Sequence, residues 1–382
     1  MLVSNCFRGI RLTKHINCRQ LRTLVPQAYA LIENSAKALI NKAERKLFGP
    51  TSEEIVRDVD LGDKYCLITG ANGGLGLEMT RCLNARDAHV LMACRNTYAA
   101  NIASKKVCKN LDRLSIGEVN FASLRSVKNF TDRLAAEDKK FDIVILNAGV
   151  FGIPRTITED GLETIFQVNY LSQIYMLMNI EKLLASNARV VFLTSESHRY
   201  VNWPLEKRLL PTEEMFSLPA NEYTSIKAFN VSKLCCIFAM HYLGYRWMNT
   251  GRGVLSATPG SFIRTKLCSN WWAYELLYMS MQPFNKSISQ AAATPLYCAT
   301  SPELEGMTAI HFKNCKRCEE SELALDSHLS FRLFDMTLRM IDERVRHFES
   351  PLLEAKEKPE PEQTEKVPKE PIEDDLITSY SG

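Results

Sequence analysis

Four glycines between Thr69 and Gly76 have the spacing of a phosphate-binding turn. The segment is TGANGGLG, with glycines at Gly70, Gly73, Gly74 and Gly76. Glycines permit a tight turn and let backbone N–H groups approach a pyrophosphate, and the start of a following helix attracts negative charge. Because an apolar run precedes this cluster and a helical pattern follows it, we predict a dinucleotide site rather than a purely structural turn.

Arg95 stands at the end of the next apolar run, where dinucleotide sites often place an acid that binds the ribose 2′-hydroxyl. A guanidinium instead pairs bidentately with a 2′-phosphate. We therefore expect NADP as the cofactor, with NAD as the alternative. An arginine that simply faces solvent is the structural alternative, because arginines are common on surfaces.

Cys315 and Cys318 form a single CxxC motif. A zinc site needs two more ligands at matching spacing, so we expect an ordinary surface turn and no metal. The chain has twelve cysteines, and several lie inside apolar runs, where they are small core residues more often than disulfides. This usage favours an intracellular compartment, either cytoplasmic or mitochondrial.

Short apolar runs alternate with helical patterns through the middle of the chain. We expect strands over 64–70, 89–95, 141–149, 188–195, 253–260 and 307–312, and helices from the glycine turn to about 85 and over 122–137, 161–185, 226–248 and 326–348. Continuous apolar strands are typical of parallel sheets covered on both faces. The alternation predicts an α/β fold with a doubly wound parallel sheet (a Rossmann fold) in three α/β/α layers. Ligands of such sheets bind at the carboxyl ends of the strands.

The net charge of +3 hides two oppositely charged ends. Residues 1–50 hold nine Lys or Arg against two acids, and residues 351–382 hold four Lys against nine acids. The acid-free start resembles a mitochondrial targeting segment; a membrane-surface helix and a nonspecific basic arm are the alternatives. The Pro/Glu/Lys-rich end should be disordered, and protein partners through it stay an open alternative. We divide the chain into a basic N-terminal extension (1–60), one folded domain (61–348) and an acidic tail (349–382).

No stretch reaches the 18 apolar residues or more that a membrane-spanning helix needs. The most apolar and aromatic segment, 271–281, is shorter and contains Glu275, so we expect a buried or lid helix there. We expect no transmembrane span and no nucleic-acid partner.

Ordered motifs along residues 60–320 resemble those of the short-chain dehydrogenase/reductase superfamily. They are TGANGGLG (69–76), ACRN (93–96), LNAG (146–149), FQVNYL (166–171), LTSESH (193–198), FNVSK (229–233) and TPG (258–260). The local sequence is most similar to the branch whose members carry WW modules, although 1–60 contains no tryptophan and we expect no WW module there. The resemblance implies a Rossmann fold and hydride transfer between NAD(P) and an alcohol or carbonyl, by a Ser–Tyr–Lys–Asn site.

The resemblance also implies roles for individual residues. Ser195 orients the substrate oxygen, Lys233 lowers the pKa of the tyrosine and holds the nicotinamide ribose, and Asn169 supports a water that relays protons. The implied cofactor-binding residues are Thr69, Gly70, Asn72, Gly73, Gly74, Leu75, Gly76, Arg95, Asn120, Asn147, Ala148, Gly149, Lys233, Pro259, Gly260 and Thr265.

The position of the tyrosine is occupied by Phe229, which keeps the ring but has no hydroxyl to exchange a proton. General acid–base catalysis contributes about 10²- to 10⁴-fold, so we expect intact cofactor binding and severely reduced turnover. Two hypotheses follow: an oxidoreductase acting on a lipophilic, steroid- or retinoid-like substrate, or an NADP(H)-binding pseudoenzyme with a regulatory or scaffolding role. Two smaller departures are Asn120, where the family usually has Asp near the adenine amine, and Ser172, where it usually has Gly.

Tyr223 and Lys227 also match Tyr-x-x-x-Lys, six residues earlier. On one helix, six residues displace a side chain by about 9 Å and rotate it by about 240°, so Tyr223 would not overlay the usual tyrosine. A substitute proton donor at Tyr223 requires that it lie in a loop. A homodimer, common in the family, is the remaining open prediction.

Overall fold

The computed structural model describes residues 49–260 and 286–349. The chain divides into two compact units, 1–344 and 345–382, and the first carries the site. Several predictions lie outside the described residues: the basic segment 1–48, Thr265, the aromatic segment 271–281 and the acidic tail from 350 onward.

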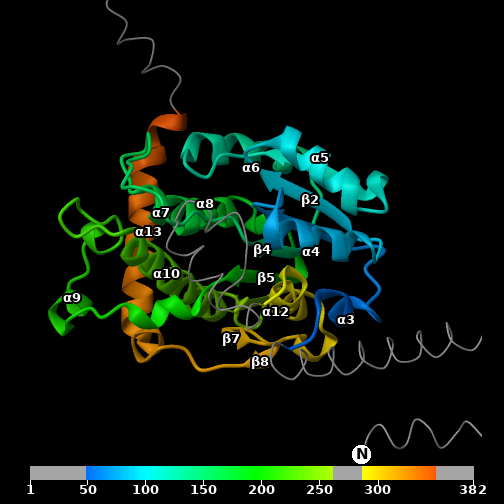
Figure 1. Cartoon of the computed structure of the whole chain (residues 1–382). Coiled ribbons are helices and arrows are strands. Elements are labelled where there is room, and N and C mark those ends of the chain that lie inside the picture. Colours follow the sequence, from blue (N-terminus) through cyan, green and yellow to red (C-terminus); the bar gives the residue numbers. More distant parts are fainter. Residues whose placement is uncertain (1–48, 261–285, 350–382) are drawn as a thin grey trace, which may run out of the picture. The chain divides into compact units, whose positions relative to one another are not determined.

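An eight-stranded sheet forms the middle layer (Figure 1). Its strands are β1 (Tyr65–Thr69), β2 (His89–Cys94), β3 (Leu114–Glu118), β4 (Phe141–Leu146), β5 (Leu184–Leu193), β6 (Gly253–Thr258), β7 (Ile310–Lys313) and β8 (Lys316–Arg317). The spatial order is β3-β2-β1-β4-β5-β6-β7-β8; all neighbours are parallel except the antiparallel pair β7–β8. This confirms the predicted doubly wound parallel sheet, whose strand order reverses between β1 and β4.

Helices cover both faces of the sheet (Figure 1). One layer contains α3 (Ser52–Val56), α4 (Gly74–Asn84), α5 (Thr97–Val107) and α12 (Ile288–Thr300), and the other contains α6 (Leu124–Glu137), α8 (Ser172–Asn179) and α10 (Ser225–Arg246). Helix α13 (Ser327–Val345) packs on α10 through a 2.9 Å hydrogen bond from the Ser330 hydroxyl to the Phe238 carbonyl. Two short helices, α7 (Thr164–Phe166) and α9 (Leu205–Leu209), complete this part of the chain.

The apolar runs that predicted the strands form the core. Every residue of β6 is buried, and so are all but the first of β1. The described cysteines are free, and Cys66 in β1 and Cys235 and Cys236 in α10 are buried. Burial raises the pKa of the Cys66 thiol, which therefore stays a neutral core residue.

Several described elements differ from the predicted ones. Helices α3, α5 and α12 have no counterpart among the predicted helices. Strand β3 was not predicted, because its sequence LSIGE is only partly buried at the edge of the sheet. The helix predicted over 161–185 begins at Thr164, passes through a π-helical segment at Gln167–Leu171 and ends as α8 at Asn179. A π-helical segment inside a helix frequently marks a functional site.

Two local contacts complete the fold, one at the start of α3 and one in the turn between β7 and β8. Ser52, at the start of α3 and within the predicted N-terminal extension, donates a 2.5 Å hydrogen bond to Glu78 of α4. Asn314 and Cys315 form the two-residue turn between β7 and β8 with φ of 51° and 56°, as in a type I′ hairpin. No helix within 49–260 or 286–349 has the length and apolar character needed to cross a membrane.

Candidate active site

Close backbone contacts require glycine at two positions of the turn after β1, Gly70 and Gly76. Gly70 has φ of +65°, in the left-handed region that side chains rarely adopt. A Cβ at Gly70 would lie 2.9 Å from the Cα of Ala148, and a Cβ at Gly76 would lie 2.5 Å from the carbonyl oxygen of Gly70. The start of α4 and the end of β4 therefore approach the turn more closely than a side chain would permit.

Gly73 has no such structural reason to be glycine. Its φ of −177° is ordinary extended backbone, and a Cβ there would meet no atom of the described residues within 4 Å. Gly73 is also the N-cap of α4 and provides no side-chain cap for the first N–H groups of the helix. The open space and uncapped helix start fit a diphosphate, whose oxygens accept such N–H groups.

Buried hydrogen bonds join the ends of β1 and β4. The Thr69 hydroxyl accepts 2.8 Å bonds from the N–H groups of Asn147 and Ala148 and donates a 2.8 Å bond to Gln173. Asn147 returns a 2.7 Å bond from its side-chain amide to the Thr69 carbonyl. Gln173, which sequence reasoning missed, also donates to the carbonyls of Ala148 and Asn169. The signal was a glutamine on an apolar helix, four residues after Asn169.

Arg95 and Asn120 lie beyond the ends of the neighbouring strands β2 and β3. Arg95 is exposed and forms no hydrogen bond or ion pair with the described residues. The side-chain oxygen of Asn120 accepts a 3.2 Å bond from the Ala122 N–H, and its backbone N–H donates to the Ser126 hydroxyl at 2.9 Å. Contact of both residues with the adenosine half of a dinucleotide stays a prediction.

Asn169 is buried in the π-helical segment and holds the loop after β4. Its side-chain oxygen accepts a 2.7 Å bond from the Val150 N–H, and its amide donates to the Val150 carbonyl and the Ser232 hydroxyl, both at 3.1 Å. A Cβ on Gly149 would lie 3.2 Å from the Asn169 oxygen. The amide thereby connects the β4 loop to α10 next to Lys233.

Lys233 is 6% exposed, and its Nζ donates a 2.8 Å hydrogen bond to the carbonyl of Leu193, at the end of β5. Burial lowers the pKa of the Lys233 ammonium. Nζ lies over the ring of Phe229, 5.4 Å from its centroid, because residues four apart share a helix face. The Phe229 ring packs edge-on against Phe151, with ring centroids 4.9 Å apart.

Ser195 follows β5 and caps a short 3₁₀ segment, Glu196–Tyr200, by accepting a 3.2 Å bond from the Ser197 N–H. Its carbonyl accepts a 2.7 Å bond from Nδ1 of His198, while Nε2 of the same ring accepts from the Ser321 N–H at 3.1 Å. Burial lowers the pKa of His198, so the ring remains neutral with its proton on Nδ1. Sequence reasoning missed this support, because Ser321 lies 123 residues away.

Tyr223 precedes α10, so it lies outside the helix that carries Phe229. Its hydroxyl donates a 2.9 Å bond to the Ile153 carbonyl, and both Tyr223 and Phe229 pack against the same small apolar cluster. Burial raises the pKa of Tyr223 to about 12, with a smaller contribution from the Glu163 carboxylate and opposition from Arg155. This is the opposite direction from an acid poised for proton transfer at neutral pH.

Pro259 and Gly260 follow β6, and Gly260 has φ of +106°. Lys286, also missed by sequence reasoning, is 6% exposed and donates to the Pro259 carbonyl at 3.1 Å and to Asn314 at 2.8 Å. Burial lowers the pKa of Lys286 to about 8. No local pattern marks this lysine, because its partners come from two distant loops.

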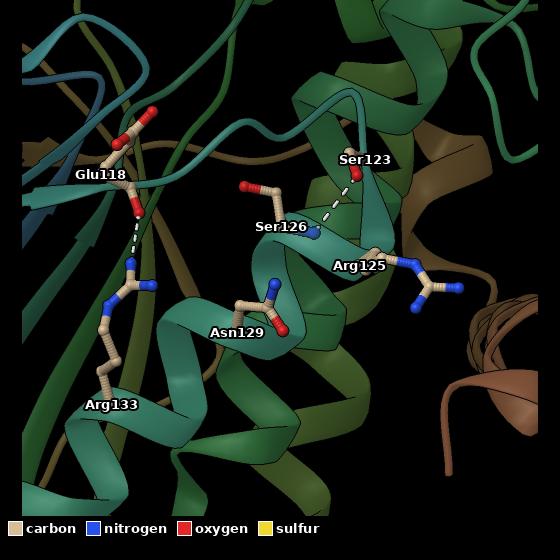
Figure 2. Close-up of a pocket in the computed structure, with 6 residues that line it drawn as sticks. All are labelled: Glu118, Ser123, Arg125, Ser126, Asn129 and Arg133. Atoms are coloured by element: carbon tan, nitrogen blue, oxygen red, sulfur yellow. Dashed lines mark hydrogen bonds between the residues drawn. The ribbon is translucent and has the colours of Figure 1, made fainter. Parts of the chain in front are cut away.

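A separate surface hollow of about 280 Å³ lies between the end of β3 and α6 (Figure 2). Figure 2 shows Arg133 donating to the Glu118 carbonyl and the Ser126 N–H donating to the Ser123 hydroxyl. None of the predicted site residues lines this hollow. Those predicted site residues that the structure describes lie instead at and beyond the carboxyl ends of the strands.

Known proteins share both the sequence and the fold. A family model described as short chain dehydrogenase matches residues 64–203. The WW domain-containing oxidoreductase of Drosophila melanogaster is 36% identical over 331 residues, which cover 85% of this chain and 80% of that protein. Retinol dehydrogenase 12 of Mus musculus is 32% identical over 294 residues, covering 74% of this chain and 88% of that protein.

A solved structure agrees at the level of the fold. The 3-ketoacyl-(acyl-carrier-protein) reductase of Brucella melitensis, crystallised with NADH, superposes with a TM-score of 0.51. It is 15% identical, and the match covers 66% of this chain and 97% of that one. These matches confirm the resemblance that the ordered motifs predicted.

Proposed function

Because this chain belongs to the short-chain dehydrogenase family, we propose that it binds NADP(H) and moves hydride between it and a lipophilic alcohol or carbonyl compound. The observation that supports this most directly is Gly73, whose open face and uncapped helix start suit a diphosphate. The cofactor supplies the hydride; the chain's residues bind, orient and handle the proton.

The proposed cofactor contacts follow the carboxyl edge of the sheet. The Gly73 and Gly74 N–H groups bind the diphosphate, and exposed Arg95 binds the 2′-phosphate that distinguishes NADP from NAD. The loop after β4 lies against the adenosine ribose. Lys233 and the Pro259–Gly260 turn, which Lys286 braces, receive the nicotinamide end.

The proposed substrate is steroid- or retinoid-like. Two observations support it: the aromatic segment 271–281 of the sequence and a relative named as a retinol dehydrogenase. Ser195 is the proposed group that orients the substrate oxygen, because its carbonyl is fixed by a buried, neutral His198. Family members use NAD(P)(H), so either dinucleotide serves as a starting probe.

A specific observation favours a second candidate, a pseudoenzyme that binds NADP(H) and acts through regulation or scaffolding. Phe229 has no hydroxyl, and the Tyr223 hydroxyl is occupied by the Ile153 carbonyl. In this alternative the chain keeps the dinucleotide site and has lost hydride transfer.

The decisive experiment compares wild type, Phe229→Tyr and Phe151→Tyr. Phe151→Tyr is the matched control, since it adds a hydroxyl to the ring packed against Phe229. Calorimetry with NADPH and NADH measures binding, and a panel of retinoid and steroid carbonyls measures turnover. We expect NADPH binding by all three and turnover raised by Phe229→Tyr alone.

Three results contradict parts of the proposal. Failure of the wild type to bind either dinucleotide removes both candidate functions. Binding without turnover by the wild type, together with turnover by Phe229→Tyr, selects the pseudoenzyme. Equal affinity for NADH and NADPH removes the proposed role of Arg95.

A further inference from the structure

We propose that Lys233 itself exchanges the proton with the substrate oxygen, so that this chain replaces the tyrosine of its family by a directly acting lysine. The inference rests on the proposed hydride transfer and names its missing proton donor. In the family pattern the lysine acts through the tyrosine hydroxyl; at Phe229 there is no hydroxyl between the ammonium and the substrate.

The hydrogen bonding of Lys233 leaves donors available. An ammonium carries three N–H groups. Nζ uses one for the Leu193 carbonyl at 2.8 Å, and the described residues offer no second hydrogen-bond partner. Because Leu193 lies two residues before Ser195, the ammonium is anchored at the same strand end that presents the proposed substrate-orienting hydroxyl.

The Phe229 ring contacts the Lys233 ammonium but has no hydroxyl that could accept a hydrogen bond from it. Nζ lies 5.4 Å from the ring centroid, within the range of a cation–π contact. The ring is itself fixed by its edge-on contact with Phe151 at 4.9 Å. A phenylalanine therefore keeps the packing of the site and leaves the remaining N–H groups of Lys233 without a hydrogen-bond acceptor among the described residues.

The surroundings make this ammonium a better acid than a surface lysine. Burial lowers the pKa of Lys233, and the Cys236 thiol on the same helix opposes this by favouring the charged form. From β5 the ammonium is faced by the neutral Leu193 carbonyl, and no carboxylate among the described residues acts on it. An acid whose pKa is lowered toward the working pH transfers its proton more readily.

The proton balance of the reduction is simple. As the carbonyl carbon accepts hydride from NADPH, which leaves as NADP⁺, the electron pair of the C=O π bond moves to oxygen. That oxygen bonds to the proton that leaves Lys233 Nζ, the N–H bond breaks, and Lys233 becomes a neutral amine. Water then reprotonates the amine; in the oxidation direction the neutral amine takes the alcohol proton.

The sign of the pH dependence follows. Reduction needs the ammonium, so its rate falls as pH rises through the lowered pKa of Lys233. Oxidation needs the free amine, so its rate rises over the same interval. In Phe229→Tyr, a phenol takes over the proton and the pH profile shifts.

The test uses the full chain with NADPH and a retinoid aldehyde, and compares wild type with Lys233→Ala, Lys233→Arg and Lys227→Ala. Lys227, exposed on the same helix, provides the control. We expect Lys233→Ala to lose about 10²- to 10⁴-fold in turnover and to recover part of it with added ethylamine or other small primary amines. The recovered rate should depend on the pKa of the added amine, which a purely structural role would not produce.

Lys233→Arg keeps a cation for the nicotinamide ribose but cannot give up a proton, since the guanidinium pKa lies above 12. We expect it to bind NADPH within a few-fold of wild type and to lose turnover. Retained turnover in Lys233→Arg or unchanged turnover in Lys233→Ala overturns the inference, and so does a wild type that is inactive while Phe229→Tyr is active. Calorimetry separates these results from failure of the proposed function, which would appear as absent NADPH binding in the wild type.

Discussion

The glycine turn after β1 and the end of β5 beside α10 differ in what defines them. Backbone geometry defines the turn, whereas side chains define the strand end. The turn works through backbone: positive φ at Gly70, close approach at Gly76 and open space at Gly73. The strand end works through side chains, and there Phe229 occupies the position predicted for the family's tyrosine but has no hydroxyl. If the turn binds a dinucleotide as proposed, a site built from backbone stays complete when one side chain changes the chemistry beside it.

The difference extends to what surrounds each region. At the glycine turn, Thr69, Asn147 and Gln173 satisfy one another through short hydrogen bonds that fix the backbone. Around Lys233, the partners among the described residues are a single carbonyl and an aromatic ring. Hydrogen bonds therefore fix the backbone of the glycine turn. The Lys233 ammonium makes few contacts, so its pKa depends strongly on burial and on those few neighbours.

We expect the largest effects from valine substitutions at two glycines of the turn, Gly76 and Gly73, which should differ in what they disturb. Gly76→Val places a side chain against the Gly70 carbonyl and should cost about 3 kcal/mol of folding free energy. Gly73→Val occupies open space in extended backbone, so it should melt like the wild type yet bind NADPH at least about 100-fold more weakly, or roughly 2.8 kcal/mol. Thermal melting and calorimetry check the pair. Unchanged NADPH affinity in Gly73→Val would show that the diphosphate does not lie there.

Arg95→Glu tests the adenosine end of the same region. Losing a charge-assisted bond and adding a negative charge should lower the NADPH-to-NADH affinity ratio by about 10- to 100-fold. Lys106→Glu is the control, because it makes the same charge change at an exposed position on α5. A ratio that changes equally in both variants points to general electrostatics rather than a 2′-phosphate contact.

Local sequence patterns predicted most strands of the sheet. Strands β1, β4 and β6 are continuous apolar runs, and a parallel sheet buries such runs whole, so these strands could be expected from sequence. The partly exposed edge strand β3 lacks that signal. The π-helical segment at Gln167–Leu171 likewise has no marker in a sequence that reads as one helix.

The supporting residues of the site could not be predicted in the same way. Thr69 and Gln173 are 104 residues apart, and His198 and Ser321 are 123 apart, so their bonds exist only once the sheet has formed. Lys286 joins two loops that are likewise brought together by β6 and β7. Spacing finds residues that share one turn or helix face, whereas these pairs depend on the topology.

Buried histidine makes the side-chain region sensitive to acid. His311 in β7 lies 2.8 Å from the Ser256 hydroxyl, and burial, assisted by the neighbouring His198, lowers its pKa from 6.5 to about 3. Below about pH 6.5 the unfolded chain takes a proton that the folded chain refuses, so this contribution to stability is full above pH 6.5. It is lost toward pH 3, at up to about 1.4 kcal/mol per pH unit.

His311→Asn should flatten this dependence. Melting of wild type and variant between pH 7.5 and 4.5 measures the difference in slope, with His328→Asn, on the surface of α13, as control. Parallel curves for wild type and His311→Asn would mean that other groups control acid unfolding.

We expect the smallest effect from Tyr223→Phe, which tests whether the Tyr223 hydroxyl takes part in proton transfer. Tyr223→Phe removes one hydrogen bond to the Ile153 carbonyl and should cost about 1 kcal/mol of stability. Turnover should stay within about twofold of wild type, because a phenol whose pKa is raised to about 12 and whose proton is already donated to a backbone carbonyl is a poor acid. Melting and steady-state rates check the two expectations separately. If turnover disappears while the fold and NADPH binding persist, the hydroxyl before α10 is the proton donor, and the side-chain region has relocated its tyrosine rather than lost it.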